Sequence, residues 1–168
     1  MKPLRYSLLV MAVVAVASAV IGAQKKEMPA AIGDAGGHKI FDSANIEWGA
    51  PPPGFPAGAK LAVLAGNPGE KGVYTVRLKV PAGYKIMPHT HPTAEMITVI
   101  SGALHIGMGS KFDESAGHEM APGAFTSMPA GMQHFAWFTE ETIVQVHGEG
   151  PFQIDYVNSA DDPRNAKK

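Results

Sequence analysis

Residues 83–102 read GYKIMPHTHPTAEMITVISG, and the spacing of polar residues in them is the strongest indication of the fold. His89 and His91 stand two positions apart on an extended segment, so both imidazoles project from the same face. Glu95 follows at the start of the next apolar and β-branched run. Imidazole nitrogens and a carboxylate oxygen are ligands that transition metals accept. The stretch therefore predicts two strands that carry part of a metal site.

A second stretch, residues 123–138, reads GAFTSMPAGMQHFAWF and supplies a third imidazole. His134 follows the turn Pro129-Ala130-Gly131, in which the proline pre-sets the backbone. Three neutral imidazoles and one carboxylate suit one divalent transition metal (Mn, Fe, Ni, Cu or Zn), and a six-coordinate ion would keep two positions open. The predicted metal ligands are His89, His91, Glu95 and His134.

The two stretches resemble the two motifs of the cupin superfamily. The first motif is glycine, five residues, His-x-His, three or four residues, Glu, six residues and glycine, and it is filled by Gly83, His89, His91, Glu95 and Gly102. The second is glycine, five residues, Pro-x-Gly, two residues and His, and it is filled by Gly123, Pro129, Gly131 and His134. The resemblance implies an all-β fold, the cupin-type double-stranded β-helix or jelly-roll barrel, with the metal inside one mouth. Phe138 stands where the family often has Asn, which makes the pocket wall more apolar.

The rest of the chain favours the same fold class. Short apolar or alternating runs recur between Gly- and Pro-containing turns, and no convincing amphipathic helix interrupts them. In residues 72–80 the alternation places Arg77 on the outward face. Strands are expected at 46–48, 60–64, 72–80, 84–91, 95–100, 103–108, 119–121, 125–128, 133–138, 143–147 and 152–157. We predict a single barrel domain over 46–157, an extended arm over 24–45 and a polar, frayed tail over 158–168.

Composition excludes several classes of protein. The 168 residues include 14 Lys and Arg against 15 Asp and Glu, so there is no basic field of the kind that drives nucleic-acid binding. The absence of cysteine from the sequence rules out disulfides, thiolate metal sites and cysteine nucleophiles.

The N-terminus has the layout of a secretory signal peptide. Lys2 and Arg5 precede an apolar run, and small residues follow it, so residues 1–23 are expected to be removed after Ala19 or Ala23. The alternative is an uncleaved membrane anchor. Cleavage changes the net charge from −1 to −3, because the two N-terminal cations are lost. We expect a periplasmic or secreted protein with no membrane attachment after cleavage.

The pocket wall is expected to be apolar. If His134 points inward, alternation brings Ala136 and Phe138 with it and turns Trp137 outward. By the same rule Glu95 brings Ile97 and Val99 inward. The candidate lining residues are Met87, Phe125, Met128, Met132, Phe135 and Phe138. Since the mature chain has only two arginines, neither predicted to face inward, a small and mostly neutral or apolar substrate fits best.

A late strand leaves two alternatives open. Gln145 and His147 share one face, and Val144 and Val146 share the other. If the polar pair faces inward, Gln145 and His147 are candidate catalytic residues, in proton transfer or in support of the metal ligands.

These observations favour a metalloenzyme of the dioxygenase, oxidase, decarboxylase, isomerase or lyase type. Resemblance to some metallo-cupins implies that Glu95 can also act as a base. The alternative is a non-catalytic, metal-stabilised module that binds a small ligand or a sensor partner. The resemblance also implies a homodimer, with Trp48 and Trp137 as candidate interface aromatics.

Overall fold

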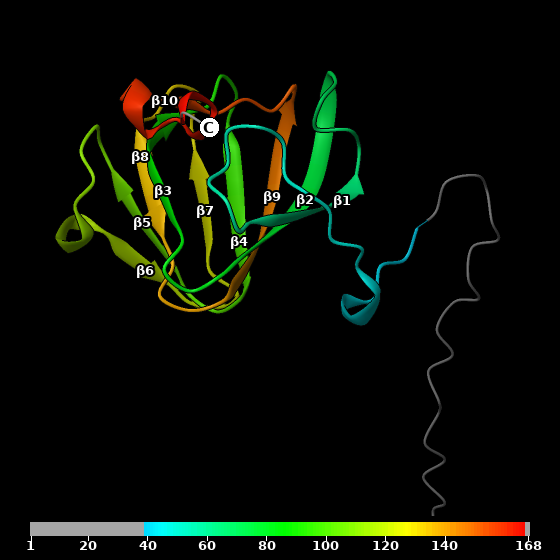
Figure 1. The fold of residues 1–168 in the computed structure, drawn as a ribbon. Coiled ribbons are helices and arrows are strands. Elements are labelled where there is room, and N and C mark those ends of the chain that lie inside the picture. Colours follow the sequence, from blue (N-terminus) through cyan, green and yellow to red (C-terminus); the bar gives the residue numbers. More distant parts are fainter. Residues whose placement is uncertain (1–38, 167–168) are drawn as a thin grey trace, which may run out of the picture. The chain divides into compact units, whose positions relative to one another are not determined.

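The computed structural model describes residues 39–166, which form two five-stranded antiparallel sheets packed face to face (Figure 1). One sheet has the strand order β1-β2-β9-β4-β7. Its strands are β1 (Lys60–Ala65), β2 (Gly72–Val80), β4 (Glu95–Ser101), β7 (Phe125–Met128) and β9 (Thr142–Gly150). The predicted signal peptide and most of the predicted arm lie outside the described residues.

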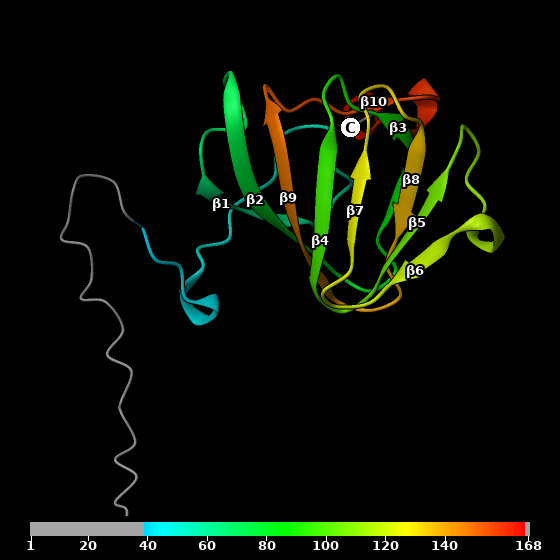
Figure 2. The same cartoon turned by 180° about the vertical axis from the view of Figure 1, so that it is seen from behind.

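The other sheet has the order β10-β3-β8-β5-β6, and Figure 2 shows both sheets from behind. Its strands are β3 (Lys85–Thr90), β5 (Leu104–Met108), β6 (His118–Met120), β8 (His134–Trp137) and β10 (Asp155–Tyr156). Hydrogen-bonded neighbours are mostly not consecutive in sequence, as expected for a jelly roll. The predicted all-β class and double-stranded β-helix are confirmed.

Four 3-10 turns complete the described structure, and residues 39–166 contain no α-helix. The turns are η1 (Ser43–Asn45), η2 (Glu114–Ala116), η3 (Ser159–Asp161) and η4 (Pro163–Asn165). Among the described residues there is accordingly no helix of the length and hydropathy that a membrane crossing requires.

Alternation along the strands builds the core between the sheets. In β2 every second side chain is buried, and the register with β9 sets Val76 opposite Val146 and Leu78 opposite Val144. Because directly opposed residues of an antiparallel pair point to the same face, these four side chains meet inside the barrel. Arg77 lies on the outer face, as predicted.

The turn between β4 and β5 requires a glycine. Gly102 has a φ of 74°, in the left-handed region that other residues enter only with strain. A β-carbon at this position would also lie 2.8 Å from the Cα of Thr142. The close approach lets the Thr142 hydroxyl donate to the carbonyl of Ala103, which joins the β4–β5 turn to the start of β9.

A small second core covers the outer face of β8. Phe135 is completely buried and Trp137 nearly so, although both point away from the barrel interior. Phe112, from the loop between β5 and β6, has its ring centroid 5.1 Å from Phe135 and 5.9 Å from Trp137. Gly117 packs so closely on the Trp137 indole that a β-carbon would overlap it. Trp137 is therefore covered by its own chain and cannot be the interface residue that the sequence suggested.

The segment before β1 also differs from the prediction. Residues 46–48 are not a strand, and only an isolated bridge between Gly49 and Leu61 joins this segment to β1. The chain then crosses the open side of the barrel between the two sheets (Figure 1). Tyr84 donates to the carbonyl of Pro56, and Tyr156 donates to that of Gly54, both at 2.8 Å. Residues 51–57, which we call the strap, are held to the barrel by these two bonds.

The described part of the C-terminal tail, residues 158–166, forms two 3-10 turns, η3 and η4, where a frayed tail was predicted. Arg164 donates to both carboxylate oxygens of Asp162, within η4 and its cap, and to the carbonyl of Ile154 at 3.0 Å. Asn165 donates to the carbonyl of Ser159. These bonds tie the polar tail to the segment that precedes β10.

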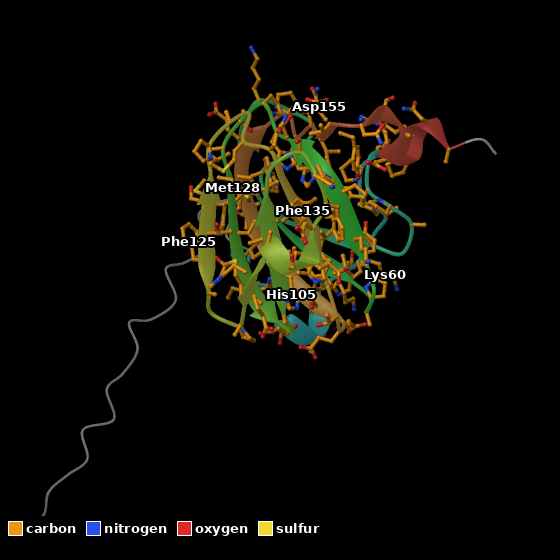
Figure 3. All side chains as sticks on the ribbon, turned by 90° about the vertical axis from the view of Figure 1, so that its left-hand side faces the viewer. Lys60, His105, Phe125, Met128, Phe135 and Asp155 are labelled. Atoms are coloured by element: carbon orange, nitrogen blue, oxygen red, sulfur yellow. The ribbon has the colours of Figure 1, made fainter. Side chains whose placement is uncertain are left out.

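We expect Phe135→Ala to lower the free energy of unfolding by about 3–5 kcal/mol, because it empties a fully buried aromatic site. Phe125→Ala is the matched control, since Phe125 is 59% exposed, and its effect should stay within about 0.5 kcal/mol. Figure 3 labels both residues. Urea unfolding measures the difference, and equal losses in the two variants would contradict the second core.

Candidate metal centre

Both sheets contribute to one cluster of polar side chains inside the barrel. His89 of β3 lies directly opposite His134, the first residue of β8, in the same sheet. His91 follows β3, and Glu95 begins β4 in the other sheet. All four side chains belong to buried residues, with 2–9% exposure. The turn that precedes His134 is fixed to the first motif, because Gly131 donates its backbone N–H to the carbonyl of His91 at 2.9 Å.

Backbone carbonyls orient the three imidazoles. The Nδ1 atoms of His89, His91 and His134 lie 2.7, 2.6 and 3.0 Å from the carbonyl oxygens of Met87, Gln153 and Met132 respectively. A carbonyl oxygen only accepts, so Nδ1 carries the proton and donates. In the neutral ring the lone pair is then on Nε2, the arrangement that a metal-binding histidine needs.

The three imidazoles converge on a common point. One ligand nitrogen from each lies within 4.8 Å of the others. The Nε2 atom of His91 is buried and makes no hydrogen bond to any described residue. A buried polar atom without a partner costs free energy, and a cation between the rings would remove that cost. The donor set and its orphaned nitrogen therefore fit a metal ion.

Glu95 lies beside two of the three histidines. Its Oε2 atom is 3.4 Å from Nε2 of His91 and 3.4 Å from Nε2 of His134. Burial alone would raise the pKa of the Glu95 carboxyl, but the neighbouring His134 and His91 outweigh burial and lower it. The carboxylate is therefore charged at neutral pH and brings negative charge to the cluster.

The histidines have different electrostatic environments. Burial, together with the charges of His134 and His91, lowers the pKa of His89 to about 3. Burial also acts to lower the pKa of His91, but Glu95 and the Gln153 carbonyl outweigh it, so the net shift is upward. The His89 imidazole therefore stays neutral, and able to bind a metal, at pH values far below the physiological range.

The cluster forms the polar end of an otherwise apolar cavity. Aliphatic side chains from the inner faces of both sheets make the walls, and the strap and the β9–β10 segment reach its mouth. Phe55 of the strap stacks on Phe152, with ring centroids 5.5 Å apart and nearly parallel planes. The remaining lining residues include Tyr74, Val76, Leu78, Ile86, Leu104, Ile106, Ala136, Phe138, Val144, Val146 and Ile154.

The predicted apolar wall is confirmed, but most of its predicted members are wrong. Phe138, Ala136 and Ile97 line the cavity, as alternation from the ligands indicated. Phe125 and Met132 are exposed, Phe135 belongs to the second core, and Met87 and Met128 are not lining residues. Nearness to the ligands in sequence does not place a side chain in the wall, because β2, β5 and β9, which carry no ligand, supply much of it.

The structure decides the orientation of β9. Val144 and Val146 face the cavity, and Gln145 and His147 lie half-buried on the outer face. There Arg77 donates to Gln145 at 3.1 Å, and Thr75 lies within hydrogen-bond distance of His147 at 3.0 Å. Gln145 and His147 are therefore wrong as candidate catalytic residues, because the sheet separates them from the cavity.

Three aromatic residues of the cavity, Phe55, Tyr74 and Phe152, are absent from the set that the sequence predicted. Tyr74 shares the inner face of β2 with Val76. The alternation of residues 72–80 was the sequence signal that could have identified Tyr74 as a lining residue. Phe152 lies against His91, with ring centroids 5.3 Å apart. The strand predicted over residues 152–157 is limited to β10, and Phe152 lies in the irregular segment before it.

Comparisons with known proteins agree with this architecture. The family model described as the ChrR cupin-like domain matches residues 37–153. The polyketide cyclase RemF from Streptomyces resistomycificus aligns with a TM-score of 0.62 and 17% identity, over 75% of this chain and 89% of its own. An RmlC-like cupin from Shewanella frigidimarina aligns with a TM-score of 0.52 and 15% identity, over 67% and 91%. At these identities the structural likeness shows the fold alone. A search of curated proteins finds no match.

For the metal-free protein, we expect the free energy of unfolding to fall as pH is lowered from 6.5 towards 3. The unfolded chain protonates residue 89 below its ordinary pKa of 6.5, whereas the folded protein keeps it neutral down to about 3. Since the unfolded state then binds more protons, acid favours it. The lowered pKa of Glu95 acts in the same sense below 4.5, and the raised pKa of His91 opposes it.

The measurement is urea unfolding in the presence of a chelator at several pH values. His89→Gln should show a shallower dependence between pH 6.5 and 4.5, because it removes the titrating ring. An equally steep dependence in that variant would contradict the assignment.

Proposed function

Because the chain belongs to the ChrR cupin-like domain family, we propose that it is an exported, metal-dependent cupin enzyme that acts on a small and mostly neutral or apolar organic molecule. The observation that carries the proposal is the convergence of three carbonyl-oriented imidazoles, one of which has a buried Nε2 atom without a partner. A cation between the rings would satisfy this nitrogen.

The proposed ligands are His89, His91, His134 and Glu95. Three neutral imidazoles and one carboxylate would leave a divalent ion with one net positive charge. A divalent transition metal bound there supplies Lewis-acid or redox chemistry to an oxygen-bearing substrate. The oxidoreductase, decarboxylase, isomerase and lyase classes all use such a site.

The cavity supports the proposed substrate class. Its walls are aliphatic and aromatic, so the body of the substrate is apolar. The two arginines within residues 39–166 are engaged elsewhere, since Arg77 bonds Gln145 on the outer face and Arg164 pairs with Asp162. No guanidinium from the described residues is therefore free in the cavity for a second anionic group.

Glu95 is the proposed proton-transfer group. It is the carboxylate among the residues that line the cavity, and its lowered pKa keeps it ionised at neutral pH. A carboxylate that leaves its two histidines during the reaction would accept a proton from a substrate held in the cavity.

Export is part of the proposal. Residues 1–23, with two cations before an apolar run and small residues after it, support a signal peptide that is cleaved after Ala19 or Ala23. Export would place the protein in the periplasm or outside the cell. Self-association into a homodimer also remains a prediction, now without Trp137.

We expect the chain that starts at residue 24 to hold close to one metal ion and His91→Ala to lose it, because that variant removes one of three converging nitrogens. Elemental analysis by mass spectrometry after isolation from the exported fraction measures both. His147→Ala is the matched control, since it removes an imidazole from the outer face and should retain the metal.

Equal metal content in the two variants would contradict the centre. Turnover that persists in a fully metal-free preparation would contradict the metalloenzyme. A metal-loaded protein that binds apolar ligands without converting them would instead identify a binding module.

We expect the full-length chain, produced in a Gram-negative host, to appear in the periplasmic extract with an N-terminus at Val20 or Gln24. Intact-mass measurement gives the cleavage site. Val13→Arg places a charge in the apolar run and should leave uncleaved precursor in the cell. An intact N-terminus in the unaltered protein would contradict export by this route.

A further inference from the structure

Tyr74 differs from the other tyrosines that the structure describes. Tyr84 and Tyr156 donate their hydroxyls to carbonyls of the strap, which leaves them structural. The Tyr74 side chain is buried and lines the same cavity as the histidine cluster. Its hydroxyl makes no hydrogen bond to any of residues 39–166. A phenol usually finds a partner when it is buried, so this hydroxyl is available to something that enters the cavity.

Strand register points the Tyr74 ring towards the metal ligands. Tyr74 of β2 is opposite Gly148 of β9, and Gly148 is in turn opposite Glu95 of β4. The three residues form one row across three neighbouring strands, on the inner face. The backbones of Tyr74 and Glu95 are therefore about 10 Å apart, two inter-strand spacings, and the residue between them, Gly148, has no side chain.

The missing side chain of Gly148 is what lets the phenol cross this gap. A β-carbon at Gly148 would overlap the Tyr74 hydroxyl oxygen and would lie 2.7 Å from Cζ. The hydroxyl end of the ring thus rests on the glycine, one strand from Glu95. Phe152 meets the ring edge-on, with centroids 6.3 Å apart, and holds it from the mouth side.

We propose that Tyr74 is a ligand-binding residue of this site: its hydroxyl donates a hydrogen bond to the oxygen or other anionic atom by which an apolar ligand binds at the histidine cluster. This inference rests on the proposed metal centre. The row Tyr74–Gly148–Glu95 places a donor where the cavity otherwise offers only hydrocarbon beside the cluster. Burial, and then the charge of Glu95, raise the pKa of Tyr74 to about 12, so the hydroxyl keeps its proton at neutral pH.

The ligand class follows from these surroundings. The apolar walls accept the hydrocarbon body of a ligand. A cation at the histidine cluster and the Tyr74 hydroxyl would both bind one electron-rich atom at the end of that ligand. Carbonyl, enolate, phenolate and carboxylate oxygens satisfy both the cation and the hydroxyl donor.

Azide binding to the cobalt(II)-loaded mature protein tests the proposal, with the visible absorption bands of cobalt as the readout. Tyr74→Phe removes only the hydroxyl, and we expect cobalt uptake to be unchanged and azide affinity to fall about tenfold, as for loss of a hydrogen bond to a charged group. Gly148→Ala keeps the tyrosine but displaces its hydroxyl, and should produce a similar loss.

Tyr84→Phe is the matched control. It loses a hydroxyl that donates to the Pro56 carbonyl of the strap, and it should keep the azide affinity of the parent. Azide affinities within about twofold in the parent and in Tyr74→Phe would overturn the role of Tyr74. Loss of cobalt in Tyr74→Phe would also overturn it, since the residue would then support the metal ligands instead. Failure of the parent protein to bind cobalt would contradict the metal centre itself.

Discussion

Three hydrogen bonds from imidazole Nδ1 atoms to backbone carbonyls are the constraint on which the site depends. Met87 and Met132 each lie two residues before the histidine that they hold, so these two bonds are local to the strands that carry the rings. The third is long-range, because Gln153 approaches His91 from the segment before β10. All three leave Nε2 as the free nitrogen, and the three nitrogens face one another.

This arrangement is unfavourable for the protein without a cation. Burial, and then the neighbouring His134 and His91, disfavour a proton on His89 and lower its pKa to about 3. Glu95 compensates in part, since its carboxylate lies 3.4 Å from two of the rings. A buried charged and polar cluster of this kind costs stability, and the aliphatic core around it and the second core behind β8 offset that cost.

The two faces of the β2–β9–β4 sheet have separate chemistry. Inside, valine and leucine side chains surround the cavity, and a single row places Tyr74, Gly148 and Glu95 side by side. Outside, Arg77, Gln145, His147 and Thr75 satisfy one another across β2 and β9. These four outer side chains are hydrogen-bonded to one another, whereas the hydroxyl of Tyr74 on the inner face makes no hydrogen bond to any of residues 39–166.

The fold class, most strand positions and the three clustered histidines could be predicted from the residues alone, because period-two alternation and motif spacing are local properties. It also determined that Arg77 points outward and that Ala136 and Phe138 point inward with His134. Only the tertiary structure decided which face of β9 is inner, since both of its faces carry plausible residues and the register with β2 and β4 selects one. The tertiary structure also decided that Phe135 and Trp137 belong to a second core and that Tyr74 lies in one row with Gly148 and Glu95, because these contacts join segments that are far apart in the chain.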